Sequence, residues 1–140
     1  MRAFALFFLL VAALPAAEVA KKKVGGFEFY QIELNIISKT NRERERFGLS
    51  KLTIDKNLMM QARRHAKWMA KNRSLRHGRD IVAENIAMGQ TSSTEAVQDW
   101  MNSPGHRSNI LASKHSTIGV AAYKAADGQI YWCQQFSSAL

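Results

Sequence analysis

The chain contains a single cysteine, Cys133, among its 140 residues. One thiol cannot build an intramolecular disulfide framework, and it excludes zinc sites made of several cysteines. The fold must therefore rest on a hydrophobic core, which one domain of this length can form. A hydrophobic fraction of 46% and a charged fraction of 22% are typical of a globular domain and exclude disorder as the default state.

The charge balance is strongly basic. Lys and Arg number 20 and Asp and Glu number 11, which gives a formal net charge of +9 at pH 7. This excess favours anionic partners. Composition alone leaves nucleic acid, anionic lipid and acidic envelope polymers open.

The N-terminus has the pattern of a secretory signal peptide. An apolar run over residues 3–14 is followed by proline and alanines at 15–17. The uncharged run ends at Glu18 and is shorter than the roughly 20 residues that span a bilayer, which disfavours the alternative of an uncleaved anchor. We expect a signal peptide over 1–17, with a cut as late as residue 20, and a mature chain without a transmembrane helix. Export argues against nucleic acid as a partner.

The remaining sequence divides into a basic leader, residues 18–26, and one domain over residues 27–137, because no second linker or repeat interrupts it. Apolar spacing and capping residues predict three helices and then two strands. These are helices over 31–47, from the N-cap Asp55 through Met69, and over 94–101, and strands over 117–124 and 129–136 around the hairpin signal Asp127-Gly128. This order indicates an α+β domain with an antiparallel sheet.

The sequence contains no ready-made catalytic motif such as H-E-x-x-H, G-x-S-x-G or a P-loop. His65 lies on the apolar face of the second predicted helix, which favours a hydrogen-bonded packing role. His115 suggests no role. Cys133 lies inside an alternating strand pattern and is predicted to be a packed thiol rather than a nucleophile.

Longer segments are more informative. His77-Gly78 is followed by A-E-N-I-A at 83–87, by W-M-N-S-P-G-H-R-S-N-I-L at 100–111 and by I-G-V at 118–120. With these segments in this order, the chain closely resembles the compact bacterial members of the CAP superfamily, whose domain is also called the SCP domain. The resemblance covers nearly all of the chain that follows the signal peptide. It implies an α-β-α sandwich with a central antiparallel sheet and a secreted or cell-envelope (extracellular or periplasmic) location.

The resemblance also implies a cleft lined by two histidines and two acids. Position by position, this candidate tetrad is His77, Glu84, Glu95 and His106. His77 and His106 would be the metal ligands, for zinc or another divalent cation, and the two carboxylates would hold metal-bound water or orient the imidazole rings. Two histidines alone predict weak, exchangeable binding.

Each residue of the tetrad also has a structural interpretation. Ser92 and Glu95 have the spacing of a capping box. Glu84 is expected to open a short helix, where the helix dipole would stabilise its charge. His77 and His106 adjoin turn signals and could be ordinary loop residues.

Two functions of different classes follow. The favoured one is a secreted binding or interaction module that takes a divalent metal or small ligand in its cleft, and that its basic surface holds near an anionic envelope polymer or lipid. The alternative is a metal-assisted hydrolase of peptide or wall material, with Glu84 as third ligand and Glu95 as general base. Lipid or sterol binding, credited to some members of the family, is a further alternative. The sequence does not decide whether the protein is an enzyme.

Overall fold

The structure is a computed structural model that describes residues 20–80 and 82–138, so the predicted signal peptide lies outside the described residues. The described elements, in chain order, are β1 (Lys21–Val24), β2 (Phe27–Tyr30), α2 (Gln31–Arg46), β3 (Thr53–Ile54), α3 (Lys56–Asn72), β4 (Ala83–Met88), α4 (Ser93–Met101), α5 (Pro104–Ile110), β5 (Thr117–Lys124) and β6 (Ile130–Ser137). Among the helices of this part, none has the length and apolar character needed to cross a membrane.

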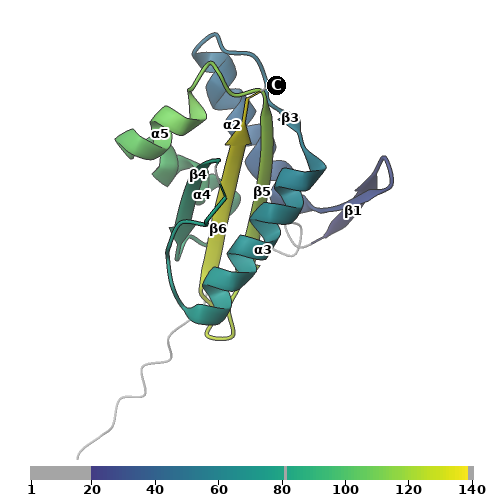
Figure 1. The fold of residues 1–140 in the computed structure, drawn as a ribbon, viewed down its shortest axis with the longest axis vertical. Coiled ribbons are helices and arrows are strands. Elements are labelled where there is room, and N and C mark those ends of the chain that lie inside the picture. Colours follow the sequence, from purple (N-terminus) through teal and green to yellow (C-terminus); the bar gives the residue numbers. More distant parts are fainter. Residues whose placement is uncertain (1–19, 81, 139–140) are drawn as a thin grey trace, which may run out of the picture.

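A four-stranded sheet in the order β3-β5-β6-β4 forms the middle of the molecule (Figure 1). The predicted hairpin is confirmed: β5 and β6 pair antiparallel over their whole length. β4 pairs antiparallel with the other side of β6. The short strand β3 pairs in parallel with β5, through Thr53 and Ile54 only, so the sheet is mixed rather than wholly antiparallel as expected.

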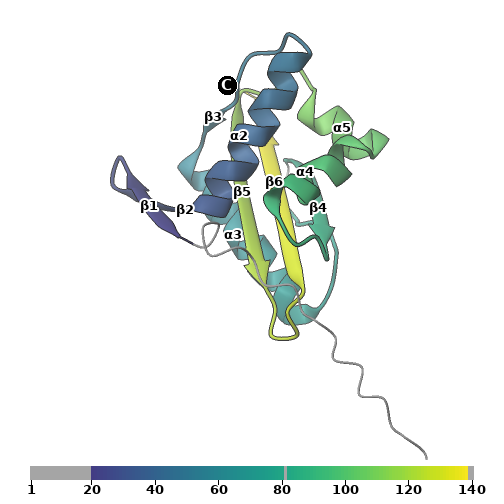
Figure 2. The same ribbon diagram turned by 180° about the vertical axis from the view of Figure 1, so that it is seen from behind.

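Helices cover both faces of this sheet, as the predicted sandwich requires. α3 lies on one face, and α2 and α4 lie on the other (Figures 1 and 2). Strand β6 contributes to both cores because its side chains alternate: Trp132 and Phe136 pack on the side of α2 and α4, whereas Tyr131 and Cys133 pack on the side of α3. Cys133 is fully buried, which confirms that it is a packed thiol.

The predicted N-cap of α3 and a close approach to the sheet fix this helix. The Asp55 side chain accepts a hydrogen bond from the Leu58 backbone N–H at 2.9 Å. At Gly119 of β5, an added Cβ would lie 2.1 Å from the carbonyl carbon of Leu58 and 2.4 Å from the backbone nitrogen of Met59. Only glycine at position 119 allows the backbone of α3 to come this close to the strand.

The lysine run that was expected to belong to a leader is an ordered strand. β1 pairs antiparallel with β2 through a turn at Gly25 and Gly26, both with positive φ. Arg63 of α3 fastens this hairpin: its guanidinium donates to the Glu28 carbonyl at 2.8 Å and forms two bonds of 2.7 and 2.6 Å with the buried carboxylate of Glu33. The ordered fold therefore begins before Phe27.

Arg44 of α2 is buried in the core, with 1% of its surface exposed. Its guanidinium donates four hydrogen bonds of 2.8–3.3 Å to backbone carbonyls, those of Ser50, Ile110, Ala112 and His115. Ile110 is the last residue of α5, and the other three acceptors lie in the loops that follow α2 and α5, so one side chain joins both loops to α2.

Candidate functional site

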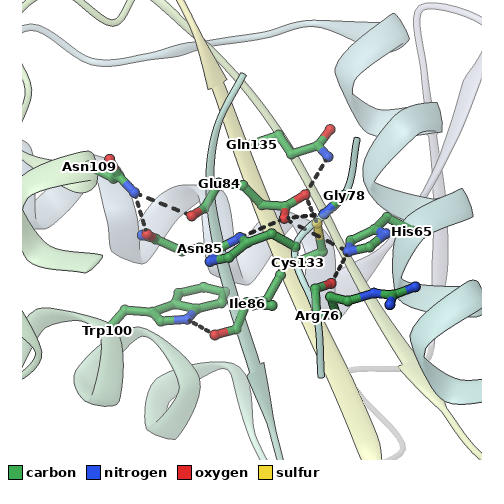
Figure 3. Close-up of polar contacts among 11 residues, drawn as sticks. His65, Arg76, Gly78, Glu84, Asn85, Ile86, Trp100, Asn109, Cys133 and Gln135 are labelled. Carbon is green, nitrogen blue, oxygen red and sulfur yellow. Dashed lines mark hydrogen bonds and ion pairs between the residues drawn. The ribbon is translucent and has the colours of Figure 1, made fainter. Parts of the chain in front are cut away.

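Glu84 is the second residue of strand β4. The prediction that Glu84 begins a short helix is therefore wrong. The strand forms because it pairs along its length with β6, where Glu84 stands opposite Gln135. The Glu84 side chain is 6% exposed and is turned toward His65 of α3 (Figure 3). The acid thus lies at the junction of β4, β6 and α3.

Four donors surround the Glu84 carboxylate. Its Oε1 accepts from the Gly78 backbone N–H and from His77 Nδ1, both at 2.9 Å. Its Oε2 accepts from Gln135 Nε2 at 2.8 Å and from Cys133 Sγ at 3.7 Å. Burial alone would raise the pKa of Glu84, but the hydrogen bonds from Gln135, Gly78 and His77 outweigh burial and hold the pKa below its usual value. The carboxylate is therefore ionised and clamps the loop at His77-Gly78.

His65 completes this cluster from the side of α3. Its Nε2 lies 2.7 Å from the Arg76 carbonyl oxygen and 3.8 Å from Glu84 Oε1. Because a carbonyl oxygen only accepts, Nε2 carries a proton. An added Cβ at Gly78 would lie 3.2 Å from the carboxylate and 3.5 Å from His65 Nδ1, so a larger residue would push these groups apart. The predicted hydrogen-bonded packing role of His65 is confirmed.

His77 has a fixed ring at an exposed position. Its side chain is 64% exposed, and its Nδ1 must donate, because an ionised carboxylate can only accept. The neutral ring therefore keeps its lone pair on Nε2. An imidazole whose other nitrogen is held by a carboxylate is the usual form of a metal-binding histidine. His77 borders an open pocket of about 650 Å³, which we call the histidine pocket and which is lined by His65, Trp68, Arg76, His77, Gly78 and Arg79.

His106 belongs to helix α5, which begins at Pro104, and not to a loop. The start of this helix is tied to β4 by amides: Asn85 Nδ2 donates to the His106 carbonyl at 3.1 Å, and Asn109 Nδ2 donates to Asn85 Oδ1 at 2.9 Å (Asn85 and Asn109 in Figure 3). Burial, followed by the nearby charge of His77, lowers the pKa of His106. At neutral pH its imidazole is therefore uncharged.

Glu95 lies at the exposed first turn of α4. Its backbone N–H donates to Ser92 Oγ at 3.2 Å, as the capping-box interpretation requires. Its carboxylate, however, accepts from the N–H and hydroxyl of Thr91, at 2.7 and 3.0 Å, rather than from Ser92. These contacts give Glu95 a capping role, and its membership of the cleft stays a prediction.

The structure thus brings His77 and Glu84 into direct contact, whereas His106 is related to His77 only through the lowering of its pKa. In residues 20–80 and 82–138, no group of three or more His, Cys, Asp or Glu side chains is arranged to hold a metal ion. Joint binding of a cation by His77 and His106 stays a prediction. Gln135 and Asn85 were missed at the sequence level, although a polar residue within an apolar strand pattern is a recognisable signal of a buried polar site.

Known proteins are similar to this chain in sequence and in fold. The sequence model of the cysteine-rich secretory protein family, CAP, matches residues 37–136. The chain belongs to the CAP family. The predicted family and sandwich fold are therefore confirmed. In this CAP domain, the A-E-N-I-A segment and the W-M-N-S-P-G-H-R-S-N-I-L segment supply the residues of the polar contacts between β4 and α5.

Two curated relatives come from Bacillus subtilis. YkwD is 35% identical over 121 residues, covering 74% of this chain and 46% of YkwD. The membrane protein YlbC is 28% identical over 121 residues, covering 74% of this chain and 34% of YlbC. The CAP domain described here thus spans less than half of the length of either relative.

Solved structures give the same result. An extracellular SCP-domain protein from Bacillus anthracis has a TM-score of 0.69 at 27% identity, covering 76% of this chain and 40% of that one. An outer surface protein from Borrelia burgdorferi also has a TM-score of 0.69, at 21% identity, covering 75% of this chain and 90% of that one. The second likeness shows the fold alone. The first is described as an extracellular protein and the second as an outer surface protein.

Proposed function

We propose that this CAP domain is an extracellular or cell-envelope binding module that takes a divalent cation or a small ligand through His77 and His106. The observation that carries the proposal is the 2.9 Å bond between His77 Nδ1 and Glu84, which orients an exposed imidazole and leaves its Nε2 free. Two neutral imidazole nitrogens suit zinc, and water would complete its shell. Binding of this kind is weak and exchangeable.

The carboxylates favour binding over metal-assisted hydrolysis. A general base needs a carboxylate oxygen free to take a proton from water. Both Glu84 oxygens already accept hydrogen bonds, so this acid is not poised as a base. The Glu95 carboxylate accepts both Thr91 bonds through Oε2, at the exposed first turn of α4.

The lining of the histidine pocket also bears on the ligand. Arg76 and Arg79 add two cationic side chains to a lining that also contains Trp68, which suits a small anionic ligand. The net charge of +9 would add a long-range attraction to an anionic envelope polymer or lipid.

Calorimetric titration with zinc chloride at pH 7.5 and pH 5.5 tests the proposal. We expect weak binding at pH 7.5 that is lost in His77→Ala and in His106→Ala, and weaker binding at pH 5.5, because protonated imidazoles cannot bind a cation. His115→Gln is the control and should leave binding unchanged. It removes an imidazole that stacks on Phe136 and does not line the histidine pocket. Equal binding by wild type and His106→Ala, or equal affinity at both pH values, would refute it.

A further inference from the structure

Strand β5 has an edge that is only partly paired. β6 occupies one side of β5, but on the other side β3 pairs only with Thr117 and Ile118. Beyond Ile118, no strand in the described part of the chain pairs with this edge. An unpaired edge presents backbone donors and acceptors to whatever lies beside it.

The backbone groups that face away from β6 can be identified. The Ile118 carbonyl accepts from the Asp55 N–H at 3.0 Å, and the Val120 N–H lies 3.2 Å from Met59 Sδ. Since backbone groups alternate along an antiparallel strand, Ala122 and Lys124 direct their N–H and C=O groups to the same side. These two residues are the free part of the edge.

This free edge forms the floor of a groove of about 480 Å³ between the two helical layers. Residues 121–124 of β5 lie along it, with α3 on one side and the start of α2 on the other (Figures 1 and 2). The side chains that line its walls are Met60, Arg63, Arg64 and Lys67 of α3 and Tyr30, Ile32 and Glu33 at the start of α2. A strand added to the central sheet would occupy this position.

The walls of the groove differ in chemistry. Arg64 and Lys67 are exposed, and the 17 residues of α3 include no Asp or Glu. Glu33 is the one carboxylate among the described lining residues, and Arg63 already pairs with it. The α3 wall is therefore cationic. On the opposite wall Ile32 and Glu33 are buried, so the 40% exposed ring of Tyr30 gives that wall its apolar surface.

We propose that this groove binds an extended acidic segment of a partner protein as an additional strand beside β5. Successive side chains of a strand point to opposite faces, so residues facing α3 would be acidic and residues facing α2 would be apolar. The four residues 121–124 span about 13 Å, enough for a segment of about four residues. The proposal concerns a surface other than the histidine pocket and does not depend on cation binding.

The peptide backbone of the partner distinguishes this proposal from attraction to a polymer or membrane. Only a peptide can pair its amides with Ala122 and Lys124, whereas a polyphosphate chain or a lipid headgroup would use the cations of α3 alone. A flat bilayer also cannot reach an edge that lies between two helical layers. An experiment that alters the backbone separates these cases.

The test is fluorescence anisotropy with a labelled ten-residue peptide of alternating Glu and Val. We expect saturable binding that falls about tenfold or more when alternate amides of the peptide are N-methylated, because this removes its strand-pairing donors. The charge variant Arg64→Gln/Lys67→Gln should weaken binding similarly. Lys71→Gln, an exposed change on α3 outside the groove lining, is the matched control and should leave binding unchanged.

Ala122→Pro removes an N–H that the sheet does not use, and proline is tolerated on strand edges, so this variant should fold. It should also abolish binding, because the peptide loses the Ala122 donor. If this variant does not fold, the N-methylated peptide decides, because it leaves the protein unaltered. Equal binding of the plain and N-methylated peptides would overturn the proposal. The proposal would also be overturned if the protein bound polyphosphate or phosphatidylglycerol vesicles but not the peptide, and if this binding were lost in Arg64→Gln/Lys67→Gln. A dimer of the chain that dissociates in Ala122→Pro would assign the groove to a second copy and would also overturn it.

Discussion

Glu84→Gln is the most informative single change in the candidate site, because it removes the charge and keeps the shape. A glutamine oxygen can still accept from the Gly78 N–H and from His77. Its new amide group would face the Gln135 amide, which now donates to Glu84 at 2.8 Å. The Gln135 side chain can rotate to offer its oxygen, so the contacts with Gly78, His77 and Gln135 are kept and only the long contact from Cys133 Sγ loses its acceptor.

The expected effect follows from the hydrogen bonds. Bonds to a charged group contribute about 1.5–3 kcal/mol and neutral ones about 0.5–1.5 kcal/mol, so each of three N–H donors loses about 1 kcal/mol. Relief from burying a charge offsets part of this loss. We expect the free energy of unfolding at pH 7 to fall by about 1–2 kcal/mol, and Glu84→Ala to cost more because the donors then lose their partner.

The dependence on pH gives an independent check. The folded pKa of Glu84 lies below its unfolded value, so the stability that its charge supplies is complete above the unfolded value of about 4.3 and is lost as pH falls through the folded pKa. Glu84→Gln should therefore show a flatter decline in stability than wild type below about pH 4.5.

Urea unfolding followed by tryptophan fluorescence at pH 7 and at pH 4 measures both effects. Glu45→Gln is the control, because Glu45 is half exposed in its ion pair with Lys51 and should change stability by less than about 1 kcal/mol. The reasoning would be refuted by a Glu84→Gln protein that is as stable as wild type at pH 7. It would also be refuted if stability fell between pH 7 and pH 4 by the same amount in both proteins.

Three further outcomes are expected. Arg44→Met should lower the free energy of unfolding by about 3 kcal/mol or more, because four carbonyls lose a buried charged donor. Arg42→Met, at an exposed position of the same helix, should change it little, and equal effects of the two variants in urea unfolding would contradict this. Burial and then the charge of Glu84 raise the pKa of the Cys133 thiol, so a thiol reagent should label it only on unfolding, and rapid labelling of native protein would be inconsistent with its packing. Glu95→Gln should lower the melting temperature slightly through its bonds to Thr91; a loss of zinc affinity at unchanged stability would place Glu95 in the cleft instead.

Much of the fold could be predicted where the signals are local. Asp55 caps α3 through a residue three positions away. The β5–β6 turn combines a positive φ at Gly128 with the Asp127 side chain, which accepts from the Gln129 N–H at 3.0 Å. Each of these features depends on residues that are close in sequence, so a single sequence is enough to locate them.

Strand β4 was predicted wrongly for the opposite reason. Glu84, Asn85, Ile86 and Ala87 are all buried, so the segment lacks the alternation of a half-exposed strand, and its Ala, Glu and Met residues favour helices. The segment is extended because it pairs with β6, about 50 residues later in the chain. Local propensity could not indicate that partner.

The site shows the same division. The resemblance to the family drew attention to His77, Glu84 and His106 as single positions. The four donors to the Glu84 carboxylate depend on the register that places Gln135 opposite it and on the loop at Gly78. Register and loop path are properties of the assembled sheet, so the network could not be derived from composition or spacing.

The hydrogen bonds of Arg44 and Asn85 have a consequence for how this chain can be produced. In a family whose name refers to many cysteines, this member joins distant segments by buried side chains that bind backbone carbonyls. Its one thiol is sequestered in the core. Folding therefore includes no oxidation step: refolding from urea should give the same yield and the same Tm in air and in excess dithiothreitol, so the domain can mature in a reducing or an oxidising compartment without an oxidase or an isomerase.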